Sequence, residues 1–422
     1  MMGKKTNIAL ATVALGVTIS AGTVAHLSSN EFCTASAIAR KITHPFRQQF
    51  TVNNIVTSKS LDEITANAKL HFEKPSPTHA PVAILDVYGT PYEMGYQQGR
   101  LLQKEAQEMI TDFVEYFRAV LFDEQLDAIY TQLEPHIPQE YKEEMRGIAD
   151  GSGLDMTLLQ WAIAIPEFTE QMCSGYALLE GTTNDDHTYH VRILDYGTDL
   201  GAQRYPTIII YHPTDGLQHA TFGWAGFIGS VGGVNEKGLA IGEIGGWDGV
   251  SKEEETYQGT PFSLLFRKIL ANATTVQEAE AIVKETKQTN RYLYVFSDGK
   301  NASTIFTGRD HFESAPEGEI LTSVTKQHEG SDLHPRPVNN CSYHGYYQER
   351  VHNYLRLGTG RFTLDEIMRI NKDIVMGTNL QVWIFRHDTQ EAWVGNATEN
   401  GNKAALQPHV YIDLKQHFRS EK

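Results

Sequence analysis

Hydrophobic and polar positions divide the chain into a helical part and a following part that is rich in strands. Between residues 94 and 121, apolar side chains recur mostly at three- and four-residue steps, which predicts a helix of roughly eight turns with one buried stripe. Thr90 stands at its N-cap, Pro91 at the first helical position and Glu93 at the third, which is typical of a helix start. A short strand is predicted at 82–87, and further helical patterns cover about 123–133 and 138–150.

Glycines add two details to this helical part. Gly95 and Gly99 lie four residues apart on the first helix, which indicates close packing of its backbone against a neighbour. Gly151 and Gly153 end the pattern over 138–150, since glycine commonly terminates helices.

After Cys173 the pattern changes to short runs of alternating or β-branched residues between turn signals. These runs predict strands at 174–179, 187–194, 207–211, 220–224, 238–241, 292–297, 303–307, 319–324, 380–387, 391–394 and 410–414. Helical patterns interrupt them at 261–270, 276–285 and about 349–370. The order of sheet, helix pair, sheet and helix predicts an α+β fold, in which two antiparallel sheets pack on each other with helices outside.

The beginning of the chain has the form of a secretory signal peptide. Lys4 and Lys5 precede a mostly apolar run over 8–19, which is well short of the roughly 18 residues that span a bilayer. We therefore expect a secreted or periplasmic protein without stable membrane insertion. Two cleavage sites stay open, after 23–25 or after 35–37.

The predicted organisation begins with a signal peptide over 1–25. A polar linker or pro-region follows over 26–80, because this stretch is weakly patterned and ends in a proline-rich segment.

Composition excludes several classes of protein. The 422 residues are 41% apolar, which is typical of a globular chain, and the net charge of −16 disfavours nucleic acid as a partner. Cys33, Cys173 and Cys341 allow at most one internal disulfide. For an exported chain we favour a Cys33–Cys341 pair with Cys173 reduced, although the connectivity stays open.

The residues around Cys173 carry the candidate chemistry. Arg192 and Asp195 lie on a strand that can pair with the strand after Cys173. Their three-residue spacing puts them on opposite faces unless the strand ends or bulges between them. Taken alone, a buried inert cysteine and a surface ion pair explain these residues better than a catalytic site.

An ordered series of motifs changes that interpretation. It comprises the G-x-P-x-E-x-G-x-x-x-G stretch over 89–99, the helix segment 145–149, Cys173-Ser174, the R-x-x-D-Y strand over 192–196, the glycine-rich hairpin over 226–240 and Gly259-Thr260-Pro261. Across about 84–395 the chain resembles the N-terminal-nucleophile hydrolases, specifically the penicillin acyltransferase-like, self-cleaving cysteine family. That family is related to bile-salt (choloylglycine) hydrolase, penicillin V acylase and acid ceramidase.

The resemblance implies a four-layer αββα sandwich and self-cleavage between Met172 and Cys173. A helical α-chain segment over 81–172 would then precede a β-chain over 173–422. Cys173 would be the nucleophile that forms an acyl-thioester, and its freed α-amine, with an ordinary pKa of about 8, would be the base.

The resemblance also assigns roles to the residues around the nucleophile. Asp195 would hold the terminal amine, while Arg192 would pair with Asp195 and orient the thiol or the substrate. Ser323 stands where the family has an oxyanion-holding Asn, so it would take that role with one hydroxyl, or Asn339 or Asn340 would replace it.

Two further patterns decide against other sites. His187 and His190 do not share a strand face and lack a carboxylate pattern, so we expect no metal, and no cofactor is implied. Residues 245–247 lack the Asn that bile-salt hydrolases carry there, which disfavours bile salts as substrates.

The sequence therefore predicts an exported, self-processing cysteine amidohydrolase or acyltransferase that acts on a linear amide or N-acyl substrate. The alternatives are a catalytically weakened binding or structural protein and an esterase of the same fold. The acyl group, the leaving amine, hydrolysis against transfer and the oligomeric state, a homo-oligomer included, stay open.

Overall fold

The computed structural model describes residues 59–169, 173–245, 256–322, 337–345 and 348–419. The predicted signal peptide, Cys33, Met172 and Ser323 lie outside these residues. Two sheets form the centre of the described chain. The larger has the order β1 (Lys69–Glu73), β2 (Val82–Gly89), β5 (Pro206–Pro213), β6 (His219–Trp224), β7 (Gly232–Asn235), β8 (Ala240–Gly245), β9 (Tyr292–Ser297), β10 (Ala302–Gly308) and β11 (His311–Pro316). The smaller has the order β12 (Cys341–Gly345), β3 (Ser174–Leu178), β4 (Tyr189–Leu194), β13 (Gln381–Arg386), β14 (Glu391–Asn396) and β15 (His409–Asp413).

Helices cover the sheets on both outer faces. The helices of the described residues are α3 (Leu61–Thr65), α4 (Pro91–Leu101), α5 (Gln103–Arg118), α6 (Asp123–Leu133), α7 (Gln139–Ser152), α8 (Met156–Ala164), α9 (Phe262–Asn272), α10 (Val276–Glu285), α12 (Gln348–Gly358), α13 (Leu364–Ile374) and α14 (Leu414–Phe418). Within the described ranges, none is long and apolar enough to cross a membrane.

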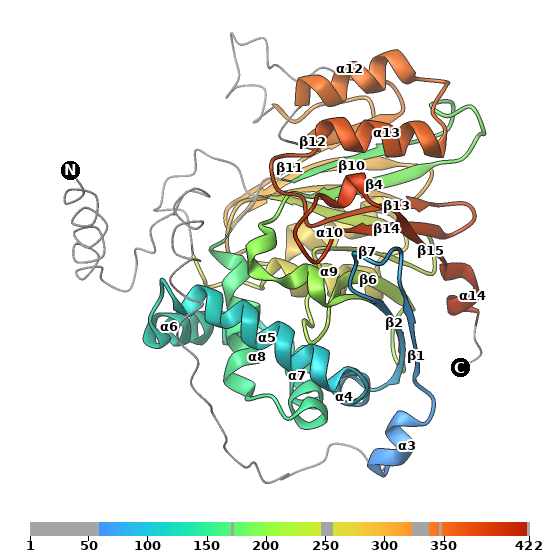
Figure 1. Cartoon of the computed structure of the whole chain (residues 1–422). Helices are drawn as coiled ribbons and strands as arrows, with labels where there is room; N and C mark the ends of the chain where they lie inside the picture. Colours follow the sequence, from blue (N-terminus) through green and yellow to red (C-terminus); the bar gives the residue numbers. More distant parts are fainter. Residues whose placement is uncertain (1–58, 170–172, 246–255, 323–336, 346–347, 420–422) are drawn as a thin grey trace, which may run out of the picture.

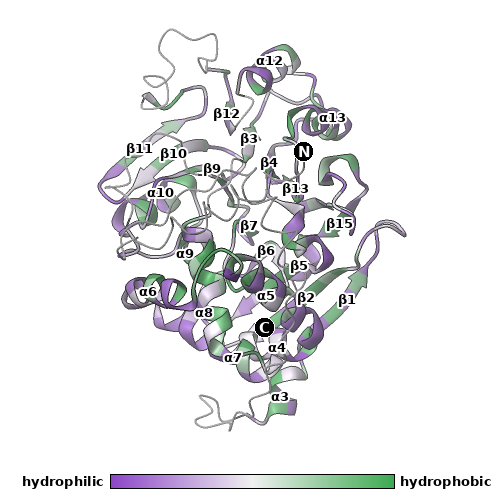
Figure 2. Cartoon of the chain, turned by 60° about the vertical axis from the view of Figure 1, so that its left-hand side comes forward, coloured by the Kyte–Doolittle hydropathy of each residue, from purple (hydrophilic) through white to green (hydrophobic). Residues whose placement is uncertain are grey.

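Three buried clusters show the four layers. Phe222 of β6 and Trp383 of β13 belong to a core between the two sheets. Phe266 of α9 packs with the strands of the larger sheet, and Ile370 of α13 packs with those of the smaller. Figure 1 shows α12 and α13 beyond the strands of the smaller sheet, and Figure 2 shows both hydrophilic and hydrophobic residues on them. The αββα fold is therefore confirmed.

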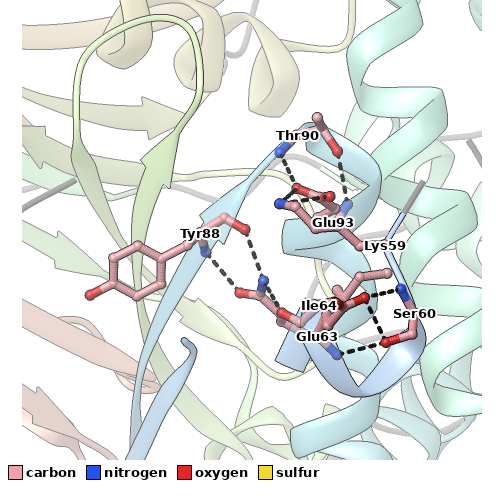
Figure 3. Close-up of polar contacts among 8 residues, drawn as sticks. Lys59, Ser60, Glu63, Ile64, Tyr88, Thr90 and Glu93 are labelled. Atoms are coloured by element: carbon pink, nitrogen blue, oxygen red, sulfur yellow. Dashed lines mark hydrogen bonds and ion pairs between the residues drawn. The ribbon is translucent and has the colours of Figure 1, made fainter. Parts of the chain in front are cut away.

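The start of the helical segment follows the sequence prediction, but one long helix becomes two. The Thr90 hydroxyl accepts from the Glu93 N–H, and the Glu93 carboxylate accepts from the Thr90 N–H (Figure 3). The helix breaks at Leu102, where φ is −111° and ψ is 34°. The apolar periodicity continues through the break because α4 and α5 both bury their stripes, against different partners.

Glycines let α4 and α7 touch through their backbones, as predicted. A Cβ on Gly95 would lie 2.0 Å from the Glu144 carbonyl oxygen, and one on Gly99 would lie 2.4 Å from that of Ile148. No larger residue fits these positions unless the helices separate. The predicted helix over 138–150 ends at Gly153, which has a φ of +77°.

The structure departs from the predicted elements in several places. Residues 319–322 are not a strand, and β11 and β12 lie on either side of them. The larger sheet contains one parallel pair, β2 with β5, so it is not wholly antiparallel. The helical region predicted over 349–370 is two helices, with Thr363 capping the second.

The predicted polar linker contributes structure from residue 59 onward. Ser60 and Glu63 cap α3 reciprocally, and β1 pairs with β2 at the edge of the larger sheet. The Gln97 side chain donates to the carbonyls of Ile64 and Tyr88, which fastens α3 to the body. The sequence analysis did not predict α3 and β1, because their contacts are to strands and helices that come later in the chain.

Candidate active site

Cys173 lies where the two sheets meet. It directly precedes β3 of the smaller sheet, and its N–H donates to the Ile244 carbonyl of β8 in the larger sheet at 3.1 Å. The residue is 1% exposed. Backbone pairing across the sheets therefore fixes the nucleophile candidate from both sides.

Strand pairing brings Arg192 beside the thiol. β3 and β4 are antiparallel with Gly175 opposite Arg192, so the pairing expected from the sequence is confirmed. The Arg192 Nη2 group lies 3.6 Å from Cys173 Sγ and donates toward it. Alternation along β4 points Val191 at α12 and α13 and Arg192 at the opposite sheet.

Arg192 has its ion pair with Glu243, and within the described residues it forms none with Asp195, its expected partner. Arg192 instead donates from Nε to the Glu243 carbonyl at 2.9 Å and from Nη2 to the Glu243 carboxylate at 3.0 Å. The reason is topological, because the inward face of β4 lies across from β8. Burial raises the pKa of the Glu243 carboxyl, and the charge of Arg192 opposes that shift.

Glu243 is a site residue that sequence reasoning missed. One signal was present: it is a lone carboxylate within the apolar strand β8. Such a charge is buried at a large cost unless a partner faces it. The sequence did not identify which cation that partner would be.

Asp195 follows the end of β4. The alternation of side chains between the two faces of a strand, which would put Asp195 opposite to Arg192, therefore does not apply to it. Its Oδ1 accepts from Asn379 Nδ2 at 3.0 Å, while its buried Oδ2 accepts no hydrogen bond from the described residues. Burial raises the pKa of Asp195 to about 7, against the hydrogen bonds from Met376 and Asn379. Asn379 also donates to the Leu194 carbonyl and accepts from the Ala405 N–H.

The thiol itself is held protonated in this arrangement. Burial raises the pKa of Cys173 well above its usual range, Arg192 opposes this shift, and the carboxylates of Glu243 and Asp195 reinforce it. A nucleophilic thiolate therefore needs a base close to the sulfur.

The thiol opens into an apolar cavity. The cavity has an empty volume of about 670 Å³, counting the part open to solvent. It is lined by Met109, Phe113, Pro166, Thr169, Cys173, Leu194, Tyr196, Leu200, Ala202, Trp224, Phe227, Val231, Glu243, Phe262, Tyr292 and Leu380. Both the helical segment and the sheets contribute to this wall, and aromatic and aliphatic side chains dominate it.

The remaining candidates have other places. Asn340 donates to the Glu180 carbonyl. The residue after it, Cys341, pairs with Leu178, at the end of β3 that is far from Cys173. Asn339 and Asn340 therefore do not replace the oxyanion residue at the thiol. Ser323 itself is outside the described residues, as are Met172 and Cys33.

The two histidines considered for metal lie apart in their contacts. His187 pairs with Asp388 at 2.7 Å on the rim, whereas the buried His190 bonds to Ser297 between the sheets. Among the described residues, no group of three or more His, Cys, Asp or Glu side chains is suited to holding a metal ion.

Comparison with known proteins shows which family the sequence around this site is similar to. Residues 182–314 match the family model described as "Acyl-coenzyme A:6-aminopenicillanic acid acyl-transferase", which confirms the resemblance to that family. Protein dcd1B of Dictyostelium discoideum is 29% identical over 57% of this chain and 53% of its own. Protein dcd1A of the same organism is 30% identical over 51% of this chain and 55% of its own length. The chain thus spans about half the length of these relatives.

Among solved structures, the chain is similar to a conjugated bile acid hydrolase from Clostridium perfringens. The identity is 13%, the match covers 58% of this chain and 93% of that one, and the TM-score is 0.39.

Proposed function

Because residues 182–314 carry the sequence of the penicillin acyltransferase-like family, we propose that this protein is a self-cleaving cysteine amidohydrolase or acyltransferase. The observation that carries the proposal is the position of Cys173. Its thiol contacts Arg192, lies beside Asp195 and opens into an apolar cavity. Inert buried cysteines do not need a buried cation and a half-satisfied carboxylate around them.

Self-cleavage would create the active enzyme. Cys173 Sγ attacks the Met172 carbonyl carbon, the C–N bond to Cys173 breaks as the acyl group moves to sulfur, and the thiol proton passes to the nitrogen. Water then hydrolyses this thioester. The products are a carboxylate on Met172 and a free amine on Cys173.

The freed amine supplies the base that the uncut chain lacks. An α-amine has an ordinary pKa of about 8, so it can take the thiol proton near neutral pH. Oδ2 of Asp195, to which no described residue donates a hydrogen bond, is an acceptor suited to hold this amine. Arg192 favours the thiolate, and Glu243 balances the charge of Arg192 inside the protein.

Turnover of an amide would follow the same bond changes. The thiolate attacks the substrate carbonyl, the leaving amine takes the proton, and an acyl-thioester on Cys173 remains. Water or an acceptor amine then releases the acyl group. The largely apolar lining of the cavity favours a substrate with an uncharged, apolar acyl group, since a charged group would lose its hydration against these side chains.

The amino-terminal sequence supports export of this enzyme. Lys4 and Lys5 with the apolar run over 8–19 form the signal on which that part of the proposal depends.

The first prediction tests self-cleavage. We expect the wild-type chain to separate into two pieces on a denaturing gel, with Cys173 at the amino terminus of the downstream piece. The Cys173→Ala chain should stay intact. Cys341→Ala is the matched control, because Cys341 is equally buried and distant from the cavity. It should cleave as the wild type does.

A thiol-directed acylating probe gives the second reading of the same site. We expect stoichiometric labelling at Cys173 in the cleaved protein only. A wild-type chain that stays intact and yet turns over amides would rule out the mechanism, and comparison of amide with ester turnover separates an amidase from an esterase.

A further inference from the structure

The chain that leads to Cys173 is fastened by a buried carboxylate. Glu167 ends the short helix η2 (Ile165–Glu167) and is 0% exposed. Its neighbours Pro166 and Thr169 line the cavity that holds the thiol. The position of Glu167 therefore affects the shape of one cavity wall.

Four donors hold Glu167, and all of them come from the part of the chain after Cys173. One carboxylate oxygen accepts from the Phe262 N–H at 3.1 Å. The other accepts from the hydroxyls of Thr289 at 2.5 Å and Tyr292 at 2.9 Å. The Glu167 carbonyl accepts from Asn290 Nδ2 at 3.2 Å.

A second anchor lies two residues further along. The Thr169 hydroxyl donates to the Ile165 carbonyl at 2.9 Å, so the Tyr196 phenol is the donor to Thr169 at 2.9 Å. Tyr196 directly follows Asp195 in the chain. The segment 165–169 is thus fixed both to the start of α9 and to the residues that form the candidate site.

Packing alone does not explain a carboxylate at this position. None of the hydrogen-bond donors that the described residues give Glu167 is charged. Burial raises the pKa of Glu167 to about 7, and the charge of Glu243 reinforces that shift. A buried acid without a cation is costly, which is typical of functional positions more than of structural ones.

We propose that Glu167 is a positioning residue that sets the segment 165–169 for self-cleavage and then keeps Pro166 and Thr169 in the cavity wall of the cleaved enzyme. This inference depends on the proposed function. It predicts two separate effects, one on the rate of self-cleavage and one on substrate affinity. A residue that only stabilises the fold would produce neither.

Glu167→Gln tests the proposal because it keeps the size of the side chain. Its amide nitrogen must face either the two hydroxyls or the Phe262 N–H, so at least one donor loses its acceptor. We expect self-cleavage to slow by about tenfold or more, as when a buried hydrogen-bond partner is lost. In the fraction that does cleave, KM for an apolar amide should rise several-fold while kcat changes little.

Three comparisons make the result decisive. Thr289→Val removes one donor without touching the cavity lining, and it should give a smaller change in the same direction if Glu167→Gln fails to fold. Thr286→Val is its matched control, because in the described part of the chain the Thr286 hydroxyl bonds only to the Ile282 carbonyl of α10. Glu144→Gln breaks another buried contact between the two parts of the chain and should lower thermal stability without raising KM.

The outcomes separate the two proposals. A wild-type chain that neither cleaves nor labels at Cys173 overturns the proposed function and this inference together. A wild type that cleaves, with Glu167→Gln and Thr289→Val matching it in cleavage rate and KM, overturns the inference alone. Loss of stability without either kinetic change, as in Glu144→Gln, also overturns it.

Discussion

At the scale of single residues, the candidate site is a set of buried charges that are only partly neutralised. Arg192 lies between the thiol of Cys173 and the carboxylate of Glu243, and it contacts both. Asp195 accepts from Asn379 with one oxygen, while no donor among the described residues hydrogen-bonds to its other oxygen. These groups are suited to receive the charge that appears when an amine and a thiolate form at position 173.

The raised pKa of Asp195 gives a pH-dependent stability in the uncut chain. The pKa is about 7 in the folded protein, above the ordinary 3.8, so the folded state binds this proton more tightly than the unfolded state does. Protonated Asp195 therefore contributes to the free energy of unfolding below about pH 4. This contribution is lost as the pH rises through about 7.

Asp195→Asn in a Cys173→Ala background measures this effect. We expect the free energy of unfolding of Asp195→Asn, relative to that of its parent, to increase between pH 4 and pH 8. The increase should be at most about 4 kcal/mol, since the shift spans about three pKa units. Urea unfolding at both pH values is the measurement, and an unchanged difference would contradict the burial argument.

At the scale of elements, the backbone contact between α4 and α7 fixes the helical segment that walls the cavity. Gly95 and Gly99 of α4 face the backbone of α7, and Gly147 and Gly151 of α7 face that of α4. Glycine is unfavourable within helices, so four of them at one contact indicate that close approach outweighs helix propensity.

Gly99→Ala tests this contact. A Cβ would lie 2.4 Å from the Ile148 carbonyl oxygen, so the helices must separate. We expect a loss of about 1–3 kcal/mol in the free energy of unfolding, even though alanine favours helices. Gly223→Ala is the control, because nothing lies within 4 Å of a Cβ there. It should leave stability unchanged or slightly raised.

At the scale of the whole molecule, the two parts of the chain share a sheet and a core. β2 from the first part pairs in parallel with β5 from the second, from Ala83 opposite Thr207 onward. Glu144 and Arg267 form a buried two-bond ion pair between α7 and α9, with both distances at 3.0 Å. Separation of the parts would expose this charge pair and the apolar core.

We therefore expect the pieces to remain together after self-cleavage. Size-exclusion chromatography of the cleaved protein should give one peak at the size of the intact chain, and denaturant should be needed to separate the two bands. Elution as two species in native buffer would contradict the shared sheet.

Local signals in the sequence determined a large part of this architecture. The capping box at Thr90 and Glu93, the glycine at the end of α7 and the alternating strands around Cys173 all depend on neighbours within a few residues. For that reason they could be predicted, and the position of Cys173 before a strand that pairs with β4 followed from them.

Tertiary structure alone decided which partners those residues have. Arg192 is 51 residues from Glu243, and Asp195 is 184 residues from Asn379, so no local pattern links them. Periodicity indicates which side of a strand a side chain occupies, but not which strand lies across from it. The order of strands in the two sheets supplied that information, and with it the charges that surround the thiol.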